Sequence, residues 1–89
     1  MQSKENKIID ARPFVEIYAN LSEPQRRELN RKCVIANLYS TRQTLWNWGT
    51  GRTQPGNALI GKSFAGILSR FLGCTVYFKT LFPLNPIAR

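Results

Sequence analysis

This 89-residue sequence has no histidine, and none of its acidic residues lies after Glu28. Histidine is the commonest general base and zinc ligand, so its absence removes much of the acid–base and metal chemistry open to a small protein. No catalytic triad, carboxylate pair or metal cluster can be assembled from what remains. We therefore expect no enzyme activity, no metal site and no cofactor.

Cysteine and long apolar runs are scarce as well. Cys33 and Cys74 fit no metal-ligand spacing, and we interpret both as small apolar thiols in a reducing compartment, because a disulfide would require secretion. No apolar run approaches the roughly 20 residues that span a membrane. Residues 1–7 are polar and lack the apolar segment of a signal peptide. The sequence predicts a cytoplasmic protein with no membrane partner and no evident small-molecule ligand.

The charges that are present are unevenly placed. Five of the 13 basic residues lie within residues 1–28 beside all five acids, whereas residues 29–89 hold eight basic residues and no acid. Such a segment attracts polyanions and gains counterion release when it neutralises phosphates. Charge alone does not distinguish DNA from RNA or from an anionic membrane. The choice among these partners therefore rests on the side chains that the predicted helices present.

Hydrophobic spacing and helix-end signals predict an all-α protein, a compact bundle of four to five helices. The first helix starts near Asp10 as its N-cap, with Pro13 in the first turn and one apolar stripe. Residues 22–25 form a capping box for the second helix. Its C-terminal half is apolar on two sides, which predicts a helix packed between neighbours. Its apolar residues are Leu29, Cys33 and Ala36 on one side and Val34, Ile35 and Leu38 on the other.

Glycine and proline mark the ends of the later predicted helices. A third helix runs from Thr41 to about Gly49, and a fourth, capped by Asn57, runs to Leu72 and stops at Gly73. Residues 75–82 have the β-branched and aromatic content of a strand, but a lone strand has no pairing partner, so a short C-terminal helix is favoured. Residues 1–9 are predicted to be a flexible basic arm, residues 10–82 the domain, and residues 83–89 a tail.

The third helix carries the residues that favour DNA among these polyanionic partners. At about 100° per residue, Leu45 and Trp48 share its inward side. Arginine reads guanine bidentately in the major groove, and glutamine or asparagine reads adenine in the same way. The opposite side is therefore typical of a base-reading helix, with Arg42, Gln43, Trp46 and Asn47. The hydroxyl groups of Ser40 and Thr41, beside the helix N-terminus, suit a phosphate.

The run from Ser40 to Pro55, STRQTLWNWGTGRTQP, resembles the recognition helix and following loop of the lambda-repressor-like helix-turn-helix proteins, the Cro-type or xenobiotic-response-element family. The family pattern places hydroxyl and polar residues first, then an aliphatic and a core aromatic residue, then a glycine–basic turn and a proline. Residues 64–68 resemble the next core helix of the family. The likeness covers about residues 22–73.

Carried over position by position, the resemblance implies base contacts from Arg42, Gln43 and Asn47, and phosphate contacts from Thr41 and Arg52. It implies that residues 10–82 are a helix-turn-helix DNA-binding domain, with residues 41–49 in the major groove. The protein would be a small transcriptional regulator, bacterial or phage-borne, that binds double-stranded DNA in a sequence-specific way.

The turn before the third helix departs from the family pattern. An alignment without gaps puts Ile35 where the family usually has alanine, and Tyr39 where it has the glycine of the tight turn. We therefore expect a turn one residue longer than usual.

Alternatives remain open for single residues. Trp46 fits either the DNA-facing surface or the core, because an exposed tryptophan is uncommon. Arg42, Gln43 and Asn47 could be an ordinary solvated face. The basic pairs Arg26–Arg27 and Arg31–Lys32 are interpreted as solvent-facing, with phosphate contact as the alternative.

Alternatives remain open for the function too. The chain could be an antitoxin-like protein-interaction module that no longer reads DNA, or an excisionase-like recombination accessory protein. RNA binding is disfavoured, because the outer side of the third helix lacks a row of aromatic residues for stacking. One short helix reads few bases, so a homodimer through the C-terminal aromatic segment is a further expected partner.

Overall fold

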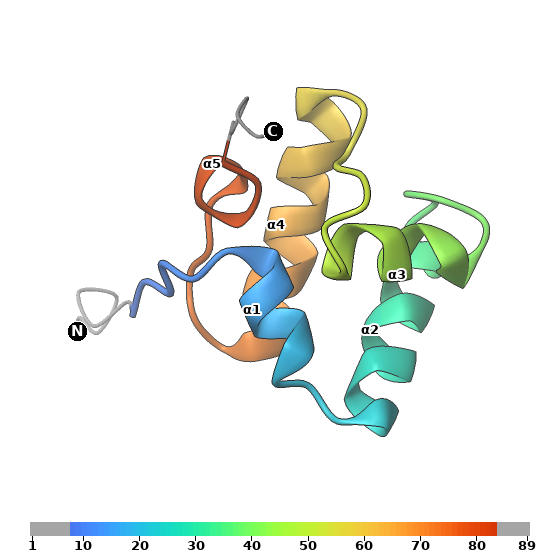
Figure 1. Cartoon of the computed structure of the whole chain (residues 1–89), viewed down its shortest axis with the longest axis horizontal. Helices are drawn as coiled ribbons and strands as arrows, with labels where there is room; N and C mark the ends of the chain where they lie inside the picture. The colour runs from blue at the N-terminus through green and yellow to red at the C-terminus, as the bar shows by residue number, and fades with distance from the viewer. Residues whose placement is uncertain (1–7, 84–89) are drawn as a thin grey trace.

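Five helices form a bundle in the computed structural model, which describes residues 8–83. Most of the predicted arm, residues 1–7, and most of the predicted tail, residues 84–89, lie outside the described residues. In Figure 1, α4 runs along the middle of the bundle, α3 extends to one side, and α5 lies on the other. The predicted all-α bundle is confirmed. Its helices are α1 (Phe14–Ala19), α2 (Glu23–Ile35), α3 (Arg42–Gly49), α4 (Ala58–Leu72) and α5 (Phe78–Leu81).

Four buried aromatic rings join α1, α3, α4 and the end of α5 at the centre of the molecule. Phe64 of α4 meets Phe14 of α1 at 4.9 Å between ring centroids and Trp48 of α3 at 5.1 Å, both in edge-to-face geometry. Phe82, just after α5, lies 5.9 Å from Phe64 and 6.0 Å from Trp48. Edge-to-face pairs set the positive ring edge against the negative face and add to the gain from burial. The cluster therefore connects α1, α3, α4 and the end of α5.

The predicted start of the first helix is wrong. Asp10 is not its N-cap, because α1 begins at Phe14 with Pro13 in the N-cap position. The backbone N–H of Asp10 instead donates to the carbonyl of Thr75 at 2.8 Å, and the carbonyl of Ile8 accepts from the N–H of Thr75 at 2.7 Å. The Asp10 carboxylate accepts hydrogen bonds from Arg12, and this bonding holds the pKa of the carboxyl below its usual value. Residues 8–10 are thus held extended beside Thr75.

The second helix begins as predicted but is not packed on both sides. The Ser22 hydroxyl accepts from the N–H of Gln25, and the Gln25 side chain accepts from the N–H of Ser22, which completes the capping box. Leu29 and Cys33 are buried. Ile35, in contrast, is 67% exposed. On the second predicted apolar side, Val34 and Leu38 are half-buried, and Leu38 packs against the core. The expectation of a sandwiched helix therefore fails at Ile35, where no described element covers the end of α2.

Residues 36–41 make the turn between α2 and α3, which is longer than the three or four residues usual in a helix-turn-helix. Asn37 adopts the left-handed conformation (φ 63°) that glycine usually supplies. The N–H of Asn37 donates to the carbonyl of Val34, and that of Leu38 to the carbonyl of Cys33, as in a Schellman motif. Tyr39 attaches the turn to α2, because its hydroxyl donates to the Asn30 side-chain oxygen at 3.1 Å.

The last two helices follow the sequence signals closely. The Asn57 side chain caps α4, and Gly73 ends it with a left-handed φ of 77°. The short helix favoured for residues 75–82 is present as α5. Thr75, however, forms an isolated parallel bridge with Ile9, so part of this segment does have an extended partner that its own sequence did not reveal. Phe78 packs over Gly61 so closely that a Cβ at Gly61 would collide with its ring.

Both cysteines are free thiols. Cys33 is buried, and this burial raises the pKa of its thiol to about 11. The thiol is therefore protonated at neutral pH and acts as a small apolar side chain. Cys74 is half-buried.

The two tryptophans of α3 allow the central cluster to be tested within one helix. Replacing Trp48 by alanine should lower the free energy of unfolding by about 3–5 kcal/mol, because it removes a large aromatic ring from a packed core. Replacing Trp46, which is 42% exposed, should cost about 1 kcal/mol or less. Urea unfolding followed by circular dichroism measures both. Equal losses for the two variants would contradict this account of the core.

Candidate nucleic-acid interface

The C-terminal end of α3 is anchored, and its N-terminal end points away from the bundle. Leu45 and Trp48 are buried, and Gly49 approaches the ring of Tyr18 on α1 so closely that a Cβ there would collide with it. In Figure 1, the first turn of α3 lies at the edge of the molecule, far from α1 and α4. The inward side of α3 therefore fixes the helix, and the other side is left facing outward.

The outward side carries the side chains that the sequence predicts. Arg42, Gln43 and Trp46 are exposed, and Asn47 is half-buried. The Gln43 amide donates to the Asn47 side-chain oxygen at 3.2 Å, so these two residues form one polar unit. We call the surface formed by Arg42, Gln43, Trp46 and Asn47 the outer face of α3.

Trp46 lies at the surface rather than in the core, which removes the core alternative for this residue. Its ring is covered on one side by Arg52, whose guanidinium carbon lies 5.4 Å from the ring centroid. A cation over an indole face is attracted by the ring quadrupole. Trp46 therefore gives Arg52 a contact partner on the same surface.

The end of α3 explains why this contact forms. Gly51 takes a left-handed φ of 81°, and its N–H donates to the Trp48 carbonyl. The N–H of Arg52 donates to the Asn47 carbonyl at 2.9 Å. These two bonds make a Schellman motif, in which the residue at the place of Arg52 normally contacts the last turns of the helix. Arg52 does so through the ring of Trp46.

Thr41 is the N-cap residue of α3 and lies exposed before its first turn. Its side chain makes no capping hydrogen bond. The first N–H groups of a helix have no partner within the helix. The Thr41 hydroxyl and the N–H groups of the first turn are thus placed together at the projecting end of α3.

A groove of about 410 Å³ separates the outer face of α3 from the N-terminal half of α2. Arg26 lines it but is committed elsewhere: its guanidinium donates to the Tyr18 carbonyl at 2.8 and 3.1 Å and stacks over the Tyr18 ring. Sequence reasoning missed this role, because Tyr18 belongs to the preceding helix. Arg27 pairs with Glu23 at 3.6 Å. Arg26 therefore fixes α2 against α1 beside the groove, whereas Arg27 makes only an exposed ion pair.

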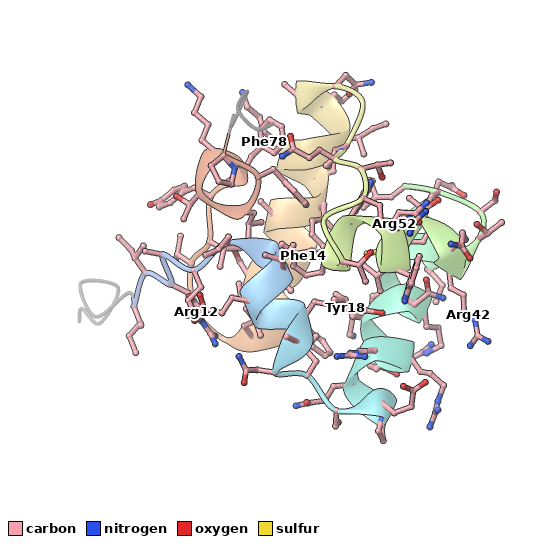
Figure 2. The ribbon with its side chains drawn as sticks, in the orientation of Figure 1. Arg12, Phe14, Tyr18, Arg42, Arg52 and Phe78 are labelled. Atoms are coloured by element: carbon pink, nitrogen blue, oxygen red, sulfur yellow. The ribbon has the colours of Figure 1, made fainter. Side chains whose placement is uncertain are left out.

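The ion pairs among the described residues involve acids from the first 28 residues of the chain. Arg12 pairs with Asp10, and Arg31 and Lys32 share Glu28, which lies just before the acid-free segment. Within residues 8–83, neither Arg42 nor Arg52 has a carboxylate oxygen within 4.0 Å. Figure 2 shows both on the α3 side of the molecule, whereas Arg12 lies on the other side. Positive charge without an internal partner is thus present at both ends of α3.

Over the described part of the chain, histidine, cysteine and acidic side chains form no group of three or more that could hold a metal ion. No helix there has the length and apolar character needed to cross a membrane. Comparisons with protein-family models, with curated proteins and with solved structures find no match to this chain.

The contact between Trp46 and Arg52 can be measured without any ligand. A double-mutant cycle of Trp46→Ala and Arg52→Ala should give a coupling free energy of about 0.5–1 kcal/mol, the range for exposed cation–π pairs. Urea unfolding of the four proteins supplies the values. A cycle of Trp46→Ala with Lys79→Ala, an exposed cation on α5 at the other side of the bundle (Figure 1), is the control and should give no coupling. Equal coupling in the two cycles would show that Arg52 has no specific contact with the ring.

Proposed function

We propose that this protein binds double-stranded DNA in a sequence-specific way, by placing α3 in the major groove. The observation that carries the proposal is the outer face of α3: it gathers an arginine and two amide side chains on a helix that projects from the bundle. Arg42 has no ion-pair partner among the described residues. The resemblance of residues 40–55 to lambda-repressor-like recognition helices supports the same function, that of a small bacterial or phage-borne transcriptional regulator.

The chemistry of the outer face suits base edges. A guanidinium binds the O6 and N7 atoms of guanine, and a carboxamide binds the N6 and N7 atoms of adenine. The hydrogen bond between Gln43 and Asn47 leaves the Gln43 carbonyl, one Gln43 N–H and the Asn47 amino group for such contacts. These two residues should therefore read neighbouring base pairs as a unit.

Thr41 and Arg52 suit the phosphates on either side of the groove. They flank α3, whose eight residues span about 12 Å. Trp46, which contacts Arg52, limits the freedom of its guanidinium before binding, so less side-chain entropy is lost at the phosphate.

A homodimer forms part of the proposal, because a single short helix reads few base pairs. Most of the C-terminal aromatic segment is used within the chain, since Val76, Leu81 and Phe82 are buried. Tyr77 is the exposed part and lines an apolar groove of about 530 Å³ between α4 and α5. This groove is where a second copy would pack.

Site selection from a random duplex library tests the proposal directly. Wild type should enrich one motif. Arg42→Ala should relax the preference at a guanine, and Gln43→Ala at an adenine and its neighbour, each by about 1–3 kcal/mol of discrimination. Arg42→Ala should also lower the salt slope of binding by about one unit.

Two exposed residues away from the outer face supply matched controls. Arg70→Ala removes from α4 an arginine without an ion pair among the described residues, and Gln54→Ala removes an amide from the loop after α3. Both should keep the wild-type motif. The proposal is wrong if Arg42→Ala and Gln43→Ala also keep it. If wild type enriches no motif and binds duplexes without preference or not at all, the interaction-module alternative gains.

A further inference from the structure

The C-terminal end of α2 leaves apolar side chains uncovered within residues 8–83. Ile35, and Ala36 directly after the helix, are exposed, and they line a groove together with Ile67 and Phe71 of α4. We call these four apolar residues the floor of the groove. The groove has a volume of about 390 Å³. Ile67 belongs to the core and Phe71 packs against it, so the floor is supported from beneath. An apolar floor on a rigid base is the usual setting for a bound apolar side chain.

Three cations stand around this floor: Arg31 and Lys32 from α2 and Arg70 from α4. Arg31 and Lys32 share the single carboxylate of Glu28, at 2.7 and 3.6 Å. Arg70 has no ion-pair partner among the described residues. The rim therefore keeps an excess of positive charge.

Floor and rim together restrict what can bind. Two copies packed symmetrically through this groove would bring the same cations against each other, and Glu28 of each copy is already paired with its own Arg31 and Lys32. DNA would satisfy the cations, but its phosphates would leave the apolar floor without a matching side chain. A helix with apolar residues on one side and carboxylates at the borders satisfies both, because such helices lie in apolar grooves and opposite charges set their orientation.

We propose that the groove between α2 and α4 binds an acidic amphipathic helix of a partner protein. Its apolar side chains lie on Ile35 and Phe71, and its carboxylates face Arg70 and the pair Arg31–Lys32. None of these residues belongs to the outer face of α3. This binding therefore does not rest on the proposed reading of DNA and is tested separately.

The probe is a synthetic helical peptide of about 16 residues with leucines on one side, glutamates at the two borders of that side and alanines elsewhere. It is titrated into the full ¹⁵N-labelled protein and followed by backbone amide shifts. We expect the shift changes to gather at residues 31–36 and 67–71. Ile35→Ser and Arg70→Glu should each weaken binding on the order of tenfold. A peptide with serine in place of leucine should not bind at this groove.

Matched variants at the other end of α4 control for exposure and charge. Leu59 is 77% exposed and Lys62 is exposed, so Leu59→Ser and Lys62→Glu repeat the same chemical changes outside the groove. Both should bind the peptide like wild type. Circular dichroism and urea unfolding establish that all four variants are folded.

Several outcomes would overturn the proposal. Shift changes on α3 or around Tyr77 would place the peptide elsewhere. Equal binding of the serine peptide would reduce the effect to charge alone. Loss of a dimer on Ile35→Ser, seen by sedimentation, would make the groove a contact between two copies. Shift changes at residues 31–36 and 67–71 caused by duplex DNA would make it part of a DNA interface.

Discussion

The packing of Trp48 against Phe64 is the contact on which the rest of the structure depends. A helix of eight residues is too short to be stable alone, so α3 exists because its inward side is held by the core. Phe64 contacts Phe14 and Phe82 as well, and the same ring therefore positions α1 and the end of α5. The direction of the outer face of α3 is set by this cluster and not by any contact of the outer residues themselves.

A division follows between the two sides of α3. Leu45 and Trp48 stabilise the fold, whereas Arg42 and Gln43 contribute nothing to the core and are free to be chosen for a ligand. The acids of the chain follow the same division, since those within the described residues lie on α1, α2 and the segment before them. Among the described residues, the positive charge after α2 therefore has no ion-pair partner, and it favours the approach of an anion.

The sequence was sufficient where the signal is local. The capping box at Ser22, the Asn57 cap and the glycines after α3 and α4 act within a few residues, and each helix end lies where they predict. Helical periodicity also separated Trp48 from the outer face. It failed where the partner is distant in the chain: the bond of Asp10 to Thr75, or the contact of Arg26 with Tyr18. The apolar pattern of α2 likewise includes Ile35, but it does not reveal whether another element covers that side chain.

The turn after α2 links these successes and failures. Asn37, in its left-handed conformation, ends α2 and redirects the chain toward α3. Ile35 lies just before this turn and Arg42 just after it. The two exposed surfaces therefore lie on either side of one turn, but they differ physically. Binding at the outer face would be dominated by unpaired cations, so its affinity would depend steeply on salt. The groove between α2 and α4 has an apolar floor and a rim partly neutralised by Glu28. The affinity of that groove would therefore depend less on salt. Salt concentration is thus the variable that separates the two surfaces in one protein.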